Sequence, residues 1–172
     1  SSALSRDQKN IADQIADICI EEYDTYGILP SVAIAQAFVE SGLGSGGSNL
    51  FGVNGCRGLG TVSSTYKYLK CLHNGYFRGK AAFRSSPEDT IYYILERGNY
   101  CEGEYPYGRY YYNVINSIDS YGWEAYDKII REKRKKEATK RSMRNLRKLR
   151  NASGFTLQIS YDLGPQTAIS DP

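Results

Sequence analysis

Glu40 is the residue of this sequence best placed for acid chemistry. It ends a short apolar segment and is followed almost at once by glycines, in the stretch AIAQAFVESGLGSGGSNLFG over residues 33–52. Eight of the 17 glycines of the chain lie between residues 42 and 60. The C-terminal end of a helix disfavours an anion by a few tenths to about 1 kcal/mol. The position is therefore poor for a carboxylate but suits a protonated carboxylic acid, which can act as a general acid.

Two helices near the N-terminus would position this glutamate. A capping-box pattern and apolar residues at helical spacing predict an amphipathic helix over residues 6–26. Pro30 opens a second helix and Gly42 ends it. Because Gln36 lies one turn before Glu40, both side chains are predicted on the same face of this second helix.

The remaining sequence predicts a mostly helical chain with a small β lobe. Threonine, valine and tyrosine residues around an Asn-Gly turn predict a β-hairpin over residues 61–84. Helices are predicted over residues 87–98, 109–118 and 121–150, and FTLQISYDL, residues 155–163, alternates as a half-buried strand does. The predicted fold class is α+β and predominantly helical: a helical body, a β-hairpin lobe, a long basic C-terminal helix and a terminal strand-like segment.

Charge is distributed unevenly along the chain. Residues 128–150 carry 12 Lys or Arg against Glu132 and Glu137, a net charge of +10, and the other residues carry 10 basic against 17 acidic side chains, a net charge of −7. Apolar positions become sparse in the second half of this helix, which predicts a segment that projects into solvent or binds a partner. We therefore expect a catalytic domain over residues 1–131 and a basic docking or assembly extension over residues 132–172.

Several classes of site and partner are disfavoured. The cysteines Cys19, Cys56, Cys71 and Cys101 form no CxxC pair and accompany a single histidine, so we expect no metal site and no cofactor. Cys56 and Cys71 flank the predicted hairpin and could pair outside the cell, but four free thiols are at least as well favoured. Nucleic-acid binding is disfavoured because the basic segment lacks interleaved aromatics. No run approaches the roughly 18 apolar residues of a membrane span.

Two blocks of the sequence resemble bacterial cell-wall glucosaminidases of glycoside hydrolase family 73, the flagellar and autolysin-type enzymes. The family pattern I-L-P-S-x-x-I-A-Q-A-x-x-E-S-G-W-G is similar to ILPSVAIAQAFVESGLG, residues 28–44, and N-L-F-G-[IV]-K-G is similar to NLFGVNG, residues 49–55. Weaker echoes in AAFRSSPEDTIYYI and GRYYYNVINSIDSYGWEAYDKII extend the resemblance over about residues 8–131. The resemblance implies a lysozyme-like fold and an N-acetylglucosaminidase that cleaves the β-1,4 bond after N-acetylglucosamine in peptidoglycan.

The same resemblance implies roles for individual residues. Glu40 would be the catalytic acid that protonates the departing glycosidic oxygen. Tyr110, in GRY, is the best match to a family tyrosine near the acetamido group of the substrate, and Tyr121 is the alternative. The glycines after Glu40 would let a sugar chain approach the backbone. The full set of expected substrate-binding residues is Gln36, Asn49, Phe51, Tyr66, Tyr110 and Tyr121.

The sequence departs from the family pattern in the residues that would assist the acid. Leu43 stands in place of a tryptophan and Asn54 in place of a lysine, and no acidic residue lies between residues 55 and 83, where the family often supplies a second glutamate. A second carboxylate could come from Glu102 or Glu104 in the tyrosine-rich loop. Alternatively the N-acetyl group of the substrate assists the reaction, with a tyrosine orienting it.

Three functions follow from these observations. The first is bacteriolytic hydrolysis of the wall. The second is lytic transglycosylation of the same polymer, which needs only one glutamate but goes with a G-L-M-Q-type segment where this chain has NLFG. The third is an inactive structural or wall-binding module. The expected partners are peptidoglycan strands and, through residues 132–172, subunits of a phage tail or secretion assembly; the expected location is extracellular, in the cell wall or on a virion.

Overall fold

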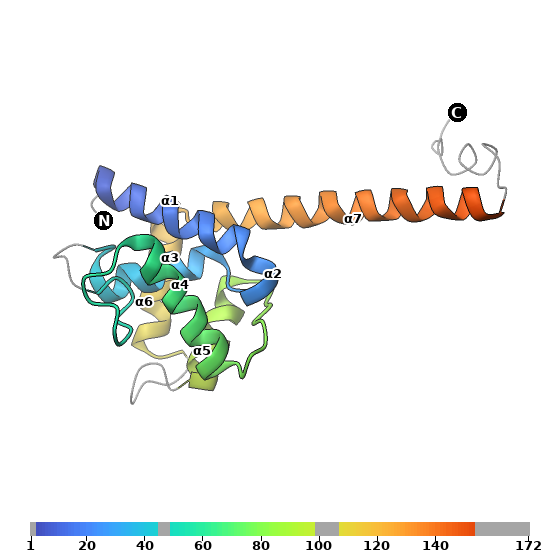
Figure 1. Cartoon of the computed structure of the whole chain (residues 1–172). Helices are drawn as coiled ribbons and strands as arrows, with labels where there is room; N and C mark the ends of the chain where they lie inside the picture. Colours follow the sequence, from blue (N-terminus) through green and yellow to red (C-terminus); the bar gives the residue numbers. More distant parts are fainter. Residues whose placement is uncertain (1–2, 45–48, 99–106, 154–172) are drawn as a thin grey trace. The chain divides into compact units, whose positions relative to one another are not determined.

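The structure of the chain, a computed structural model, describes residues 3–44, 49–98 and 107–153. Within these ranges the chain forms seven α-helices and one π-helical turn, and no β-strand (Figure 1). In chain order they are α1 Arg6–Glu21, α2 Tyr23–Tyr26, α3 Pro30–Ser41, α4 Thr61–Cys71, the π-helical turn η1 Leu72–Tyr76, α5 Pro87–Gly98, α6 Arg109–Tyr121 and α7 Glu124–Ser153. The chain divides into two compact units between Ile130 and Arg131, so α7 begins in the first unit and continues in the second.

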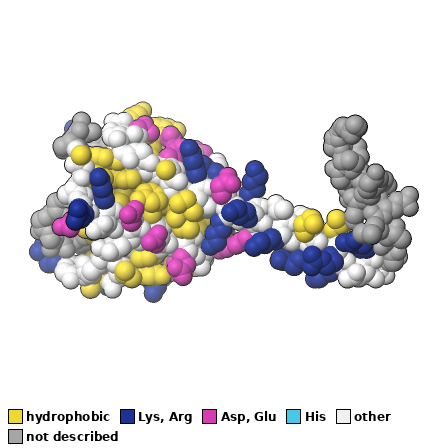
Figure 2. Space-filling model, turned by 90° about the horizontal axis from the view of Figure 1, so that it is seen from above, with side chains coloured by type: hydrophobic (Ala, Val, Ile, Leu, Met, Phe, Trp, Pro, Cys, Tyr) yellow, Lys and Arg dark blue, Asp and Glu magenta, His cyan; other side chains and the backbone are white. Residues whose placement is uncertain are grey.

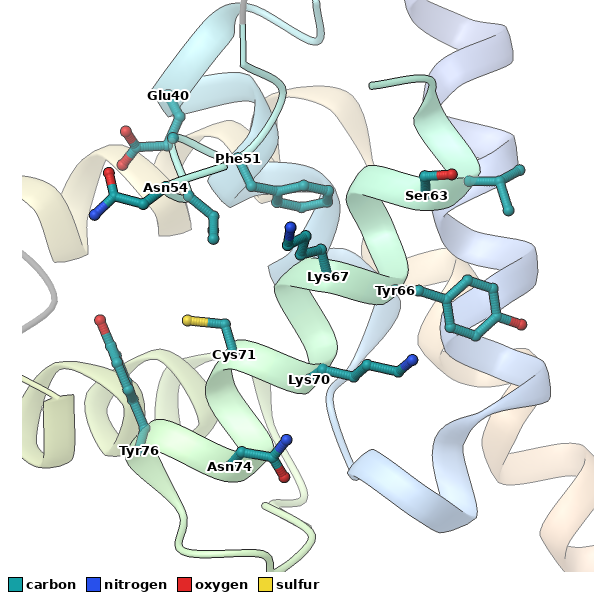
Figure 3. Close-up of a pocket in the computed structure, with 13 residues that line it drawn as sticks. Glu40, Phe51, Asn54, Ser63, Tyr66, Lys67, Lys70, Cys71, Asn74 and Tyr76 are labelled. Atoms are coloured by element: carbon teal, nitrogen blue, oxygen red, sulfur yellow. The ribbon is translucent and has the colours of Figure 1, made fainter. Parts of the chain in front are cut away.

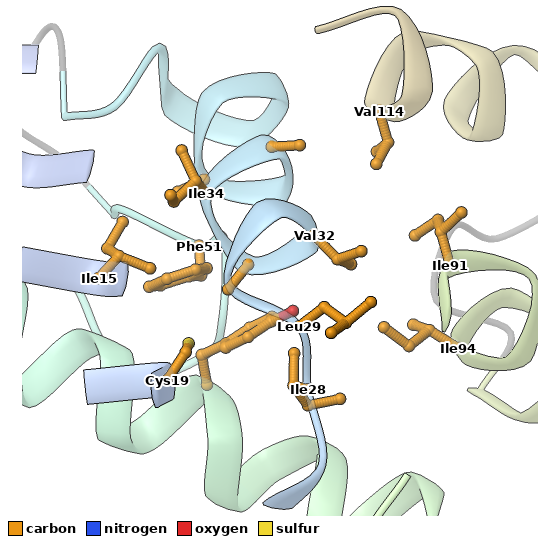
Figure 4. Packing of buried hydrophobic residues seen from close by; sticks show 14 of the residues in the cluster. Ile15, Cys19, Ile28, Leu29, Val32, Ile34, Phe51, Ile91, Ile94 and Val114 are labelled. Atoms are coloured by element: carbon orange, nitrogen blue, oxygen red, sulfur yellow. The ribbon is translucent and has the colours of Figure 1, made fainter. Parts of the chain in front are cut away.

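Helix α3 is the buried helix of the first unit. Its residues 30–37 carry no charge and are all buried. A helix without a polar face must be covered on several sides, and α1, α5 and α6 all contact α3. Figure 4 shows Ile15 and Phe51 on one side of the helix and Ile91 and Ile94 on the other. The position of the C-terminal end of α3 is therefore fixed by a core that surrounds it.

A buried carboxylate fixes the other end of α3. Asp127, in the first turn of α7, is fully buried. Its Oδ1 accepts a hydrogen bond from the backbone N–H of Ser31 at 3.0 Å, and its Oδ2 accepts one from the Ser31 hydroxyl at 2.6 Å. The first N–H groups of a helix have no partner within the helix, and the positive end of its dipole favours an anion. Asp127 therefore holds the start of α3 to the start of α7.

The predicted helices are confirmed in most of their extent. The capping box is present, because the Ser5 hydroxyl accepts from the backbone of Gln8 and the Gln8 side chain accepts from the backbone of Ser5. The helix predicted over residues 6–26 is interrupted at Glu22, which separates α1 from α2. The predominantly helical character is confirmed, but the β part of the predicted α+β class is not, because the described residues contain no strand.

The predicted β-hairpin over residues 61–84 is wrong. Residues Thr61–Cys71 form α4, and the Asn-Gly pair lies in η1 instead of a hairpin turn. The buried positions Ser64, Thr65, Tyr68 and Leu69 recur at helical spacing, and this face packs on α1. Strand propensity is a weak preference that burial overrides, and here the periodicity of the buried face decides the structure.

Helix α7 starts later than predicted. Gly122 adopts a left-handed conformation, with φ of +70°, and ends α6, so Tyr121 belongs to α6 and α7 begins at Glu124. The strand-like segment predicted over residues 155–163 lies outside the described residues. Within the described ranges, no helix has both the length and the apolar character needed to cross a membrane.

Replacing Asp127 tests its role at the start of α3. We expect Asp127→Ala to lower the free energy of unfolding by about 3 kcal/mol, because the Ser31 N–H and hydroxyl lose their acceptors in a buried site. Glu124→Ala is the matched control, since Glu124 is an exposed acid in the same helical turn. Urea unfolding followed by circular dichroism measures both, and equal midpoints for the two variants would contradict this role of Asp127.

Candidate functional site

A cleft of about 940 Å³ lies between α4 and the segment that follows α3 (Figure 3). Its size is at the upper end of the range for ligand-binding cavities. Glu40, from the last turn of α3, stands at one side of it. The other lining residues come from the segment after α3, from α4 and from η1: Phe51, Gly52, Val53, Asn54, Val62, Ser63, Tyr66, Lys67, Lys70, Cys71, Asn74 and Tyr76.

A chain of hydrogen bonds runs from the protein core to the carboxylate of Glu40. The hydroxyl of Tyr68 donates to Oε1 of Gln36, and Nε2 of Gln36 donates to the hydroxyl of Tyr110 at 3.3 Å. The Tyr110 hydroxyl in turn donates to Oε2 of Glu40 at 3.0 Å. Because Tyr68, Gln36 and Tyr110 are buried, these polar groups need partners, and each supplies the next. This series of hydrogen bonds therefore sets the orientation of Glu40, whose own side chain is exposed.

Gly52 closes the other side of the Glu40 carboxylate. Its φ of +69° is favourable only for glycine, and a Cβ atom there would lie 2.6 Å from Oε1 of Glu40. The backbone can thus approach the carboxylate without a side chain between them. Tyr110 bonds to Oε2 of Glu40, whereas Oε1 occupies the space that a side chain at Gly52 would need.

The segment around Gly52 is itself held by local contacts. The Ser41 hydroxyl donates to the backbone carbonyl of Leu50 at 2.9 Å, and the side-chain amide of Asn49 donates to the carbonyl of Val53 at 2.6 Å. The ring of Phe51 stacks on Tyr68 at a centroid distance of 4.2 Å. The NLFG block therefore ties this wall of the cleft to α3 and α4.

The structure brings together most, but not all, of the residues that the sequence singles out. Gln36, Tyr110 and Glu40 are connected by hydrogen bonds, and Phe51 and Tyr66 line the cleft beside Glu40. Gln36 is fully buried, so it acts on Glu40 only through Tyr110.

Asn49 and Tyr121 lie apart from the cleft lining. The amide of Asn49 closes a turn, and its Oδ1 is buried without a hydrogen-bond partner among the described residues. Tyr121 packs against Phe38 and Trp123 at centroid distances of 5.2 and 5.0 Å, and it borders a separate hollow of about 400 Å³. Glu102 and Glu104 lie outside the described residues.

The two departures from the family pattern fall in different places. Leu43, which stands where the similar pattern has a tryptophan, is buried in the hydrophobic core and does not line the cleft. Asn54, which stands where that pattern has a lysine, does line the cleft. The first difference from the pattern therefore concerns packing, whereas the second concerns the charge of the cleft wall.

Apart from Tyr66, sequence reasoning missed the residues that α4 and η1 contribute to the cleft. Ser63, Lys67, Lys70 and Asn74 recur at helical spacing and line the wall of the cleft that α4 and η1 form. The spacing is not apparent when the segment is interpreted as a hairpin. With a helical period of 3.6 residues, the same side chains form a polar stripe along one face. Among the residues that the structure describes, Glu40 is the sole carboxylate of the lining. The cleft therefore combines one acid with two amines.

The remaining titratable groups of the described residues form no candidate metal site. No group of three or more His, Cys, Asp or Glu side chains that could hold a metal ion occurs in the described part of the chain. Cys19, Cys56 and Cys71 are free thiols, and burial raises the pKa of each. Desolvation and the nearby Glu22 carboxylate raise the pKa of Tyr66, whose hydroxyl donates to Glu22 Oε2 at 3.4 Å. Tyr66 therefore remains a neutral phenol.

Comparison of the chain with protein-family models, with curated proteins and with solved structures finds no match. The geometry of the Glu40 site and the resemblance in the two sequence blocks are therefore the observations that bear on function.

Two glycine substitutions separate backbone strain from contact with Glu40. Gly52 and Gly58 both have φ near +70° to +80°, but no atom lies within 4 Å of a Cβ placed at Gly58. We expect Gly52→Ala and Gly58→Ala to cost similar stability, about 1 kcal/mol each, because the flexible Glu40 side chain can move aside. Only Gly52→Ala should displace the carboxylate from Tyr110.

The side-chain NMR signals of Tyr110 and urea unfolding measure the two effects. Unchanged Tyr110 signals in Gly52→Ala would show that the glycine does not place the carboxylate.

Proposed function

We propose that this chain is a peptidoglycan hydrolase that cleaves the β-1,4 bond after N-acetylglucosamine, with Glu40 as the general acid. The observation that carries the proposal is the placement of the Glu40 carboxylate beside a large cleft, between the Tyr110 hydroxyl and the backbone of Gly52. The resemblance of residues 28–44 and 49–55 to cell-wall glucosaminidases supports it. A lysozyme-like arrangement of the helical body is part of the same proposal.

Glu40 performs the proton transfers in this account. In its protonated form it gives its proton to the glycosidic oxygen as the bond between that oxygen and the anomeric carbon breaks. Tyr110 is a positioning residue, because its hydroxyl is already engaged by Glu40 and Gln36. Bound substrate covers the exposed carboxylate and excludes water from it, which strengthens its electrostatic interactions.

The positive charge that develops at the anomeric carbon needs a partner. Within the described residues the lining offers no second carboxylate for this role. The acetamido oxygen of the substrate can attack the anomeric carbon instead, and a water molecule then opens the resulting ring while Glu40 takes up the proton of that water. The glycosidic bond to the anomeric carbon breaks, the oxygen of one water molecule forms a new bond to that carbon, and Glu40 gives one proton and recovers one, so the reaction consumes one water molecule.

The single carboxylate also favours a second candidate, a lytic transglycosylase on the same polymer. In that reaction Glu40 gives its proton in the same way, but a hydroxyl of the muramic sugar attacks in place of water. The two candidates share the acid and differ in the sugar end that they leave. Either activity places the protein outside the cell, in the wall or on a virion, and residues 132–172 would serve as the docking extension.

Digestion of purified peptidoglycan tests the proposed function. We expect the wild-type protein to release fragments that carry reduced N-acetylglucosamine after borohydride treatment, read by mass spectrometry. Glu40→Gln should lower the rate by about 100- to 10,000-fold, since it removes the general acid. Glu96→Gln, an exposed glutamate near the end of α5, is the matched control and should leave the rate unchanged.

The product end separates the candidates. Anhydro-muramic ends would show that the protein is a lytic transglycosylase and not a hydrolase. Intact polymer with the wild-type protein would overturn catalysis and leave wall binding, the function of an inactive module, to be measured by co-sedimentation.

From the position of Lys67 on the cleft wall, we expect the protein to prefer acidic glycans. The Lys67 amine lies on the wall of the cleft that faces Glu40, and the stem peptides of peptidoglycan carry carboxylates (Figure 3). We expect Lys67→Gln to raise KM for peptidoglycan by about two- to fivefold, the strength of one exposed ion pair, and to leave KM for neutral N-acetylglucosamine oligomers unchanged. Lys80→Gln, exposed and outside the cleft lining, is the control. Equal effects on both substrates would contradict a charge-reading role.

A further inference from the structure

The part of α7 that belongs to the second unit exposes nearly all of its side chains. From Arg131 to Ser153 every residue is exposed except Leu146 and Arg150, which are partly buried. Two large apolar side chains are among the exposed ones: Met143 is 56% exposed and Leu149 is 54% exposed. Single exposed apolar side chains are ordinary on a protein surface, so the informative question is whether these two belong to one continuous face.

Residues 138–153 separate into two faces when placed around a helix at about 100° per residue. One face, about 140° wide, is apolar or small and is interrupted only by Arg150; it consists of Ala138, Thr139, Ser142, Met143, Leu146, Leu149 and Ser153. The opposite face, about 120° wide, carries five cations, Lys140, Arg141, Arg144, Arg147 and Lys148. Figure 2 shows hydrophobic side chains on one side of this segment and Lys and Arg side chains along the other.

The charge and the apolar face of residues 138–153 together indicate the kind of surface that they bind. Residues 128–150 carry a net charge of +10, which opposes packing of this helix against the same helix of a second copy. A purely polyanionic partner would use the cations but leave Met143, Leu146 and Leu149 exposed to water. A surface that is both negatively charged and apolar just beneath its charges satisfies both faces, and an anionic lipid bilayer is such a surface.

We propose that residues 138–153 of α7 form an interfacial helix that binds the surface of an anionic lipid membrane. The apolar face enters the boundary between headgroups and acyl chains, and the cations contact the headgroups, with their long side chains reaching past the helix. The helix lies on the membrane and does not cross it. This inference goes beyond the proposed wall hydrolysis and does not depend on it, because it concerns binding through different residues.

Vesicle co-sedimentation of the full-length protein tests the proposal. The probes are vesicles of phosphatidylcholine alone and vesicles with 30% phosphatidylglycerol, in about 0.1 M salt, where surface charges act over about 10 Å. We expect binding to the anionic vesicles and little binding to the neutral ones. A triple variant, K140Q/R144Q/R147Q, should lower the partition coefficient by about 100-fold, since each cation near an anionic surface contributes about fivefold.

A second variant and a matched control distinguish the faces. M143Q/L146Q/L149Q keeps every charge and should lower binding by about tenfold or more, because it removes the apolar contact. The control K9Q/R57Q/K80Q removes three exposed cations from the first unit and should bind as the wild-type protein does. Circular dichroism checks that each variant keeps its helix content, since Gln is a good helix former.

Three results would overturn the proposal: no wild-type binding to anionic vesicles, equal binding to neutral vesicles, or full binding by M143Q/L146Q/L149Q. If M143Q/L146Q/L149Q bound anionic vesicles fully, and bound heparin or DNA as well as the wild-type protein does, the partner of the segment would be a polyanion instead of a membrane. All of these readouts are independent of Glu40, so loss of hydrolysis and loss of membrane binding can be told apart.

Discussion

The hydrogen-bond chain from Tyr68 through Gln36 and Tyr110 to Glu40 is the interaction on which the candidate site depends. Three of its members are buried, where an unpartnered amide or hydroxyl costs about 1–3 kcal/mol. Burial in the core therefore requires these hydrogen bonds to form, and the hydrogen bonds in turn position Glu40, which is the member of the series that reaches solvent. A buried polar network of this kind orients a surface carboxylate without burying it.

The rest of the first unit can be understood as support for this chain. It joins α4, α3 and α6, so the helices must keep their relative positions for the hydrogen bonds to form. Asp127 fixes the start of α3, and the surrounding core covers its sides. Gly52 completes the arrangement because it leaves space for the Glu40 carboxylate, which a side chain at position 52 would displace.

Sequence patterns predicted the helices but not the wall opposite Glu40. The ends of α3 could be recognised because Pro30 and Gly42 have specific backbone roles. The predicted hairpin was wrong because strand-favouring side chains in α4 outweighed, in the sequence reading, the helical spacing of its buried face. Gln36 was expected to share a face with Glu40, but its link through Tyr110 could not be foreseen, since it joins residues 74 positions apart. Long-range contacts of this kind leave no local signal.

We propose that Glu40 delivers a proton to a glycosidic oxygen bound in the cleft beside it. The most direct measurement is a crystal structure of Glu40→Gln with a soluble peptidoglycan tetrasaccharide, in which the substrate remains intact. We expect a sugar chain along the cleft, with the scissile oxygen about 3 Å from the side-chain amide at position 40. A saccharide bound elsewhere, or one in the cleft with its glycosidic oxygens beyond the reach of residue 40, would contradict it.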